Sequence, residues 1–89
     1  MHRWDIISAQ AAKNQIDPSL IMGLIRQESA FNEKARSSAD ARGLMQILPA
    51  TASKLARQAR IPRYNAKKLF QAETNIVLGI YYLASLVRH

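Results

Sequence analysis

Cysteine is absent from this 89-residue sequence, and histidine occurs only at positions 2 and 89. The first absence excludes a disulfide framework and a thiolate zinc site. The second argues against a metal centre or a histidine-based catalytic pair, so we expect neither a metal nor a cofactor. Every apolar run is shorter than the ~18–20 residues of a membrane span. The chain starts with an amphipathic segment, so we expect no membrane span and no export signal within it.

Acidic side chains are also scarce, with six against thirteen basic ones and a formal net charge of +7. Such a balance favours polyanionic partners, which include nucleic acid, acidic lipid and a cell-wall polymer that carries carboxylates and phosphates. A chain of this length makes one small domain with a modest core. We therefore expect residues 1–89 to form a single domain with an anionic partner.

The hydrophobic pattern predicts helices almost throughout. The first helix covers about residues 4–15, and three apolar side chains mark its core face: Trp4, Ile7 and Ala11. Asp17 and Pro18 supply an N-cap oxygen and a proline at the first helical position, which predicts a second helix over 18–29. Because residues 20–25 are apolar on every side, we expect this second helix to be the central one of the fold.

The remainder of the chain alternates polar connections with further helical patterns. Residues 32–42 are polar and form a loop, and residues 43–48 are a short apolar run that periodicity cannot assign. Helical patterns follow over about 49–60, 66–70 and from 72 onward. The predicted fold class is all-α with about four to five helices, and with a short irregular or β segment near residues 43–47.

Glu28 is the candidate catalytic residue. It follows the apolar stretch of the second helix, and a carboxyl half-buried in apolar surroundings has its charged form disfavoured. Its pKa then rises, and the group can hold a proton near neutral pH. A general acid that breaks a glycosidic bond needs this property. A glutamate at a helix end is more commonly a solvated surface residue, so the neighbouring motifs decide between the two interpretations.

Two motifs accompany Glu28. Residues 25–32 read Ile-Arg-Gln-Glu-Ser-Ala-Phe-Asn, and residues 43–52 read Gly-Leu-Met-Gln-Ile-Leu-Pro-Ala-Thr-Ala. In order and spacing they resemble the soluble lytic transglycosylase catalytic domain, and residues 73–83 resemble the next helix of that family. The resemblance covers roughly residues 12–86. It implies a goose-type lysozyme-like fold.

The resemblance also implies a specific reaction. Enzymes of this family cleave the β-1,4 bond between N-acetylmuramic acid (MurNAc) and N-acetylglucosamine (GlcNAc) in peptidoglycan and form 1,6-anhydro-MurNAc. Glu28 matches the single acid that protonates the leaving oxygen and then acts as the base, with help from the substrate's own acetamido group. The positions matched to substrate binding are Ser29, Ser37, Gly43, Met45 and Gln46.

The proposed roles of these residues have plainer alternatives. The family serines orient the glutamate and the bound muropeptide, whereas a serine at a helix end or in a loop is commonly structural. Met45 also suits a core, and Gly43 would let the backbone approach a sugar closely. The run Glu73-Thr74-Asn75 fits capping of a helix start better than catalysis. Of the adjacent tyrosines 81 and 82, at least one is expected to pack in the core.

The sequence departs from the family pattern in the loop after Glu28. Glu33 stands where proline is usual, and Asp40 stands where glycine is usual. Aspartate tolerates a left-handed backbone better than most residues, so we expect the loop to keep its shape.

The larger departure is that the chain stops at residue 89, without the family's Ala-Tyr-Asn motif and the helices that follow it. We therefore expect a partial lysozyme-like domain whose last helix exposes its apolar face from Ile76 to Leu86. Exposed patches of this kind commonly find a partner, so self-association or binding of a missing segment is expected. The incomplete cleft argues against activity of the isolated chain.

Other functions stay open. A noncatalytic peptidoglycan-binding or assembly module could keep the fold without catalysis, and a hydrolytic muramidase is a close neighbour. A basic helical nucleic-acid binder would leave the two motifs unexplained, so no nucleic acid is expected as a partner. The resemblance implies the bacterial periplasm or cell envelope. Exo or endo cleavage and the biological setting are left open by the sequence.

Overall fold

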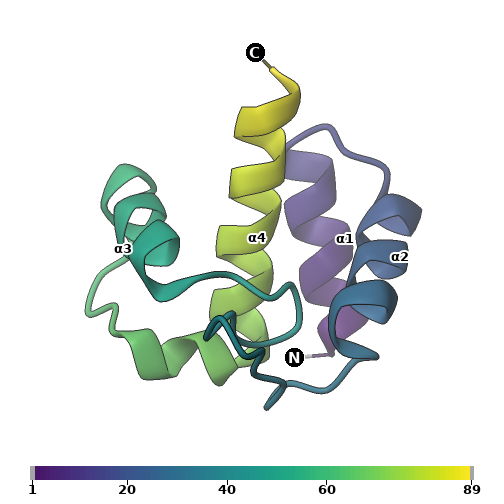
Figure 1. The fold of residues 1–89 in the computed structure, drawn as a ribbon. Helices are drawn as coiled ribbons and strands as arrows, with labels where there is room; N and C mark the ends of the chain where they lie inside the picture. Colours follow the sequence, from purple (N-terminus) through teal and green to yellow (C-terminus); the bar gives the residue numbers. More distant parts are fainter. Residues whose placement is uncertain (1, 89) are drawn as a thin grey trace.

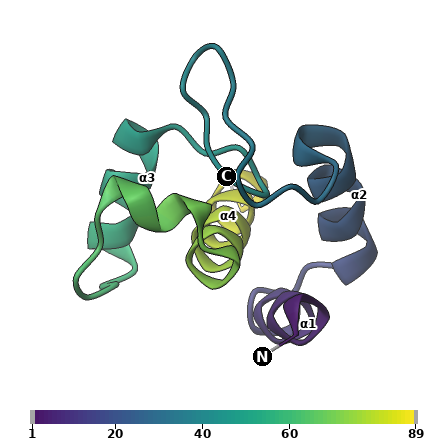
Figure 2. The same ribbon diagram turned by 90° about the horizontal axis from the view of Figure 1, so that it is seen from below.

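A computed structural model describes residues 2–88 of the chain, which form four α-helices and one 3-10 helix. The elements are α1 (Arg3–Lys13), α2 (Pro18–Ser29), α3 (Pro49–Gln58), the 3-10 helix η1 (Ala66–Phe70) and α4 (Ala72–Val87). Helix α4 runs through the middle, with α1 and α2 on one side of it and α3 on the other (Figure 1). Seen from below, the long connection between α2 and α3 projects as a loop (Figure 2).

Local signals in the sequence set the helix boundaries. Asp17 accepts a 2.9 Å hydrogen bond from the backbone nitrogen of Ser19, and Pro18 occupies the first position of α2. The predicted bounds of α2 are therefore confirmed. Helix α1 ends two residues before the predicted end, because the chain turns at Gln15, whose φ is +60°. Helix α3 likewise ends two residues early, before Arg60 with a φ of +56°.

The α2–α3 connection contains no strand among residues 2–88. Its only β-type pairings are two isolated antiparallel bridges, one between Arg36 and Arg42 and the other between Arg42 and Ile47. The short irregular or β segment expected near residues 43–47 is therefore an irregular turn. The two bridges, which share Arg42, connect this turn to Arg36 and close it at Ile47. The all-α class is confirmed.

The core forms on two sides of α4. One cluster joins α4 to α1, α2 and the α2–α3 connection through seven buried side chains: Ile6, Ile7, Ile21, Ile25, Leu44, Ile76 and Ile80. The other joins α4 to α3, η1 and the α2–α3 connection through six: Ile47, Ala52, Leu55, Ala56, Leu69 and Leu78. Because α4 contributes to both clusters, it is the central helix.

The prediction that α2 is the central helix is wrong. Helix α2 lies at the edge of the described fold and buries only Ile21 and Ile25, while Leu20 remains 51% exposed. The prediction that Trp4 marks the core face of α1 is also wrong, because its side chain is 50% exposed and Ile6 is buried instead. Both errors have one cause. Apolar character does not reveal which faces of a helix have neighbours to cover them.

The end of α4 carries an exposed apolar surface. Three of its side chains are exposed in the last two turns: Tyr82, Leu86 and Val87. The expected exposure therefore occurs over a shorter stretch than predicted, because Ile76 and Ile80 are fully buried. No helix within residues 2–88 is long and apolar enough to span a bilayer.

Candidate active-site groove

A groove of about 370 Å³ lies over α4, between α2 and the start of α3. Leu24 and Glu28 of α2 form one wall, and residues 45–48 with Thr51 form the other. The floor comes from four residues of α4: Gly79, Tyr82, Leu83 and Leu86. Glu28 is the only acidic residue among the lining side chains in the described part of the chain.

Glu28 lies in the last turn of α2 and is exposed. The half-buried setting expected from the apolar stretch before it is therefore wrong for residues 2–88. Leu24, one turn earlier on the same face, is partly buried against the groove. The carboxyl group stands at the rim, because the described residues do not cover the outer side of the groove.

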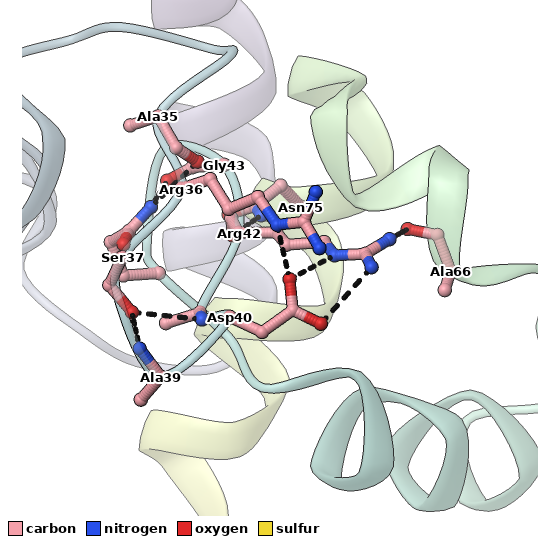
Figure 3. Close-up of polar contacts among 11 residues, drawn as sticks. Ala35, Arg36, Ser37, Ala39, Asp40, Arg42, Gly43, Ala66 and Asn75 are labelled. Carbon is pink, nitrogen blue, oxygen red and sulfur yellow. Dashed lines mark hydrogen bonds and ion pairs between the residues drawn. The ribbon is translucent and has the colours of Figure 1, made fainter.

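The opposite wall is fixed to α4 by Asn75, a fully buried residue. The Asn75 side-chain oxygen accepts a 2.8 Å hydrogen bond from the backbone nitrogen of Met45. Its amide nitrogen donates to the carbonyl oxygens of Arg42 and Leu69, both at 2.9 Å. Figure 3 shows Asn75 beside the loop that carries Arg42 and Gly43. One side chain thus connects the loop, the 3-10 helix and α4.

The run Glu73-Thr74-Asn75 was expected to act at the helix start, and Glu73 does lie in the first turn of α4. Asn75 makes no capping bond, and a signal for its actual position was present in the sequence. Asn75 lies three and four residues before Leu78 and Gly79, so it shares their face of the helix. Those two residues are buried, and Asn75 is buried with them. A buried amide needs hydrogen-bond partners, and the loop backbone supplies them.

Gly43 is buried and lies against the same anchor. Its φ is +79°, a conformation that L side chains rarely adopt, and an added Cβ would overlap the Leu69 carbonyl oxygen and the Asn75 side chain. The position requires glycine so that the loop can close onto α4. Gly43 does not line the groove. Within residues 2–88 it contributes to the packing of the loop against Leu69 and Asn75.

Gln46 and Met45 both line the groove, and each also stabilises the loop. The Gln46 side-chain nitrogen donates to the carbonyl oxygens of Ala35 and Gly43, at 3.0 and 2.8 Å. Met45 packs against both core clusters and lies so close to Gly79 that a Cβ there would overlap its sulfur. Gly79, which the sequence reasoning missed, therefore lets Met45 reach the groove floor.

Ser29 and Ser37 lie outside the groove lining. The Ser29 hydroxyl donates to the carbonyl oxygen of Ile25 at 3.0 Å, within its own helix. The Ser37 hydroxyl oxygen accepts from the backbone nitrogens of Ala39 and Ala41, at 3.2 and 3.0 Å. Of the six site residues expected from the sequence, the structure brings Glu28, Met45 and Gln46 together. Both serines have backbone partners instead.

Asp40 occupies the tip of the loop with a φ of +69°, so the expected left-handed turn is confirmed. Its carboxylate accepts hydrogen bonds from Arg42 at 3.0 and 3.1 Å and from Arg36 at 2.6 Å (Figure 3). These bonds, first of all the one from Arg42, lower the pKa of the Asp40 carboxyl. The Arg42 guanidinium also lies 5.4 Å from the Phe70 ring centroid and donates to the Ala66 carbonyl oxygen.

Glu33, which stands where the family has proline, forms an ion pair with Arg3 of α1. Arg3 also donates to the Phe31 carbonyl oxygen at 3.4 Å. The start of the α2–α3 connection is thus held against α1, while Asn75 holds its end against α4. No group of three acidic or histidine side chains in residues 2–88 could hold a metal ion.

Several groove residues were not singled out from the sequence. Leu48 directly precedes α3, Thr51 lies in the first turn of α3, and Leu86 comes from the end of α4. Tyr82 lines the groove, while Tyr81 packs against the α3 side of the core, so the two tyrosines divide their roles as expected. The motifs quoted above contain Leu48, Thr51 and Tyr82, whereas Leu86 lies beyond them.

The fold and the groove define an all-α, lysozyme-like domain whose single groove-lining glutamate faces a Gly-Leu-Met-Gln loop. Residues 5–89 match the family model of the transglycosylase SLT domain, and the chain belongs to this family.

Two curated relatives and one solved structure illustrate the similarity. The soluble lytic murein transglycosylase of Escherichia coli is 40% identical over 89% of this chain and 12% of the relative. The membrane-bound lytic murein transglycosylase E of Buchnera aphidicola is 37% identical over 92% of this chain and 38% of the relative. One solved structure is that of an inactive glutamate-to-glutamine mutant of lytic transglycosylase Slt from Pseudomonas aeruginosa. It superimposes on this chain with a TM-score of 0.89 and a sequence identity of 34%. The superposition covers 94% of this chain and 14% of the Pseudomonas chain. The chain therefore spans a minor part of each relative.

Proposed function

We propose that this domain is the peptidoglycan-cleaving part of a lytic transglycosylase. The observation that carries the proposal is the position of Glu28, alone among acidic residues at the groove and opposite the loop of Met45 and Gln46. Membership of the SLT family supports it, as do the names of the relatives, which are murein transglycosylases.

The proposed reaction uses Glu28 twice. The protonated carboxyl donates its proton to the glycosidic oxygen as the bond to the MurNAc anomeric carbon breaks, so the GlcNAc product leaves as an alcohol. The carboxylate then accepts the proton of the MurNAc 6-hydroxyl, whose oxygen bonds to the anomeric carbon. The proton count balances and no water is consumed. Glycosidases that use two carboxylates place them roughly 5–10 Å apart; within residues 2–88 no second acidic side chain lines the groove.

The substrate-binding roles follow from the hydrogen-bonding capacity of the groove wall. Both hydrogen bonds that the Gln46 amide makes within residues 2–88 use its nitrogen. Its side-chain carbonyl oxygen is therefore the group that we assign to a sugar hydroxyl. Met45 offers an apolar surface beside it. We assign Ser29 and Ser37 to orienting the end of α2 and the loop near bound muropeptide. Gly43 acts indirectly, because it lets the loop backbone pack closely against Asn75 of α4.

The cellular setting follows from the same reasoning. The relatives are named soluble and membrane-bound murein transglycosylases, so the cell envelope is the compartment in which this chain would meet its substrate. The periplasm is the finer assignment that we propose.

The decisive experiment compares digestion of purified peptidoglycan by the wild type, Glu28→Gln and Glu73→Gln. Glu73 is exposed in the first turn of α4 and lies outside the groove, so it is the matched control. We expect anhydro products from the wild type and the control and none from Glu28→Gln. Equal product from all three, or none from any, would remove the enzymatic proposal for this chain. Mass spectrometry distinguishes a muramidase, whose product ends are one water heavier.

A noncatalytic peptidoglycan-binding module is the second candidate, because Glu28 is exposed at an open rim rather than enclosed. Binding of the wild type to insoluble peptidoglycan, with no release of soluble product and no change on Glu28→Gln, would favour this candidate.

A further inference from the structure

A hollow of about 230 Å³ lies on the side of α4 that faces away from the groove. Val77, Tyr81 and Arg88 line it from α4 and the C-cap of that helix. Each of them lies two positions along the chain from a residue of the groove floor, in order Gly79, Leu83 and Leu86. Two positions correspond to about 200° around a helix, so the groove and this back hollow occupy opposite faces of α4.

The walls of the back hollow come from α1 and from the turn that follows α3. Gln10, Lys13 and Asn14 belong to the end of α1 and its C-cap, and Ala59 and Ile61 belong to the turn. Figure 2 shows α4 between α1 and α3. The back hollow therefore lies where the two flanking elements leave this face of α4 uncovered within residues 2–88.

Every charged side chain that lines the back hollow in the described part of the chain is a cation. The two are Lys13 and Arg88, and neither belongs to the three ion pairs of residues 2–88. Arg88 donates to the Asn14 carbonyl oxygen at 3.3 Å, which holds the end of α4 against the end of α1. Arg60 is exposed and stands in the chain between Ala59 and Ile61, so it adds a third positive charge nearby.

The attraction of cations to helix ends explains only part of this charge. A helix C-terminus carries about half a negative charge, which a lysine or arginine beside it offsets. Three helices end at the back hollow, namely α1, α3 and α4. Their ends together offset about one and a half of the three positive charges. The remaining positive charge favours a partner that carries carboxylates.

The floor of the back hollow is apolar, and its shape is long. Ile61 and Tyr81 are partly buried against the α3 side of the core, and Val77 is partly buried beside them. The volume is below the ~300–1,000 Å³ of a small-molecule site. The helix between Val77 and Arg88 is about 16 Å long, which matches about five residues of extended chain. A flat lipid surface cannot enter such a hollow, whereas a peptide can place a side chain in it.

We propose that the back hollow is a docking site for an extended acidic segment of a partner protein. One apolar side chain of the segment contacts Ile61, Val77 and Tyr81. Carboxylates on either side of it form charge-assisted hydrogen bonds with Lys13 and Arg88. The inference does not depend on the reaction proposed for the groove, and it adds an interaction to it. Because the hollow faces away from the groove, a partner docked there leaves Glu28 accessible.

The test measures binding of a fluorescein-labelled pentapeptide, one leucine between two pairs of glutamates, to the 89-residue chain. Fluorescence anisotropy is recorded at about 0.15 M salt, where charges more than ~8 Å apart are largely screened. One control peptide replaces the glutamates by glutamines, and another replaces the leucine by serine.

The proteins are the wild type, the charge-keeping Lys13→Arg, the single variants Lys13→Gln and Arg88→Gln, their double variant, and the control Lys67→Gln. Lys67 is an exposed lysine of η1 outside the back hollow, so its variant loses the same charge elsewhere. Circular dichroism verifies that each variant is folded.

We expect the wild type, Lys13→Arg and Lys67→Gln to bind the acidic peptide within about twofold of one another. Lys13→Gln and Arg88→Gln should each weaken binding about two- to fivefold, the effect typical of an exposed ion pair, and the double variant about four- to twentyfold. The wild type should bind both control peptides at least about threefold more weakly than the acidic peptide.

The absence of binding, or equal binding by the wild type and the double variant, would overturn the docking site. A loss in Lys67→Gln as large as in Lys13→Gln would also overturn it, because net charge alone would then explain the binding. Equal binding of the serine peptide would remove the apolar contact, and with it the peptide segment. Vesicles of phosphatidylglycerol test the other anionic surface: if the double variant lost vesicle binding and kept peptide binding, the partner would be a lipid. Peptidoglycan digestion tests the proposed function separately, since neither Lys13 nor Arg88 lines the groove.

Discussion

The side-chain oxygen of Asn75 accepts a hydrogen bond from the backbone nitrogen of Met45, thirty residues earlier in the chain. This bond attaches the wall that faces Glu28 to the central helix. The same amide also binds the carbonyl oxygens of Arg42 and Leu69, so it satisfies three backbone groups at once. The position of the candidate site therefore depends on a residue outside the groove lining.

Replacing Asn75 by alanine should lower the free energy of unfolding by about 2–4 kcal/mol. The Met45 nitrogen and the Leu69 carbonyl oxygen lose this partner, and the Arg42 carbonyl oxygen keeps only the hydrogen bond from the Ile47 nitrogen. Urea denaturation followed by circular dichroism measures this loss. Asn65→Ala is the matched control, since Asn65 is exposed and its side chain makes no capping bond to η1. Equal stability of the two variants would contradict the anchoring role.

Alanine at Gly43 should destabilise the protein by about 2–5 kcal/mol, because a side chain at positive φ is strained and its Cβ would overlap Leu69 and Asn75. Gly23 provides the opposite case. It lies inside α2 with nothing within 4 Å of an added Cβ, so Gly23→Ala should raise stability by about 0.5–1 kcal/mol. Thermal unfolding of the two variants should shift in opposite directions; a shared direction would refute the packing explanation.

The ion pairs of Asp40 should make stability depend on pH in the acid range. Hydrogen bonds from Arg42 hold the pKa of this carboxyl below its ordinary value of 3.8 in the folded protein. Its contribution is therefore fully present above about pH 4. It is lost as the pH falls from there through the lowered folded pKa.

Asp40→Asn isolates this effect, because asparagine also tolerates the left-handed backbone. The melting temperature of the wild type should exceed that of the variant at neutral pH, and the difference should vanish in strong acid. Asp17, whose pKa is lowered by the hydrogen bonds from Ser19, remains in both proteins and cancels in the comparison. A difference that stays constant down to pH 2 would be inconsistent with the ion pairs.

The exposed end of α4 should cause self-association. Leu86, which lines the groove floor, is 56% exposed, and its neighbour Val87 is 65% exposed. Sedimentation velocity should show concentration-dependent association of the wild type, which Leu86→Glu should weaken. The control Ala9→Glu places the same charge on an exposed position of α1. A monodisperse wild-type monomer at high concentration would rule the association out.

Local chemistry explains which parts of the fold could be predicted from the sequence. The start of α2 was predicted correctly because Asp17 and Pro18 act on the backbone of the next few residues. The left-handed turn at Asp40 was predictable for the same reason. By contrast, the exposure of Leu20 and Trp4 depends on which elements lie beside α1 and α2, and neither periodicity nor propensity contains that information.

The candidate site was only partly predictable. The motif identified Glu28, Met45 and Gln46, and all three line the groove. The burial of Glu28 was inferred from the apolar residues before it, but burial of a helix end depends on elements that are distant in sequence. Asn75 was interpreted locally, as part of a helix start, and Gly79 was given no role. Both are needed for contacts with residues thirty or more positions earlier in the chain.

The hydrogen bond between Met45 and Asn75 also determines when the groove can form during folding. Helices α1 and α2 are local structures that can form early, but closing a thirty-residue loop has an entropic cost that only docked partners offset. The loop of Met45 and Gln46 cannot adopt its final shape until α4 is in position, because Asn75 supplies the anchor. We therefore expect the groove to be among the last parts of the domain to form, so that a growing chain contains Glu28 well before it contains a site.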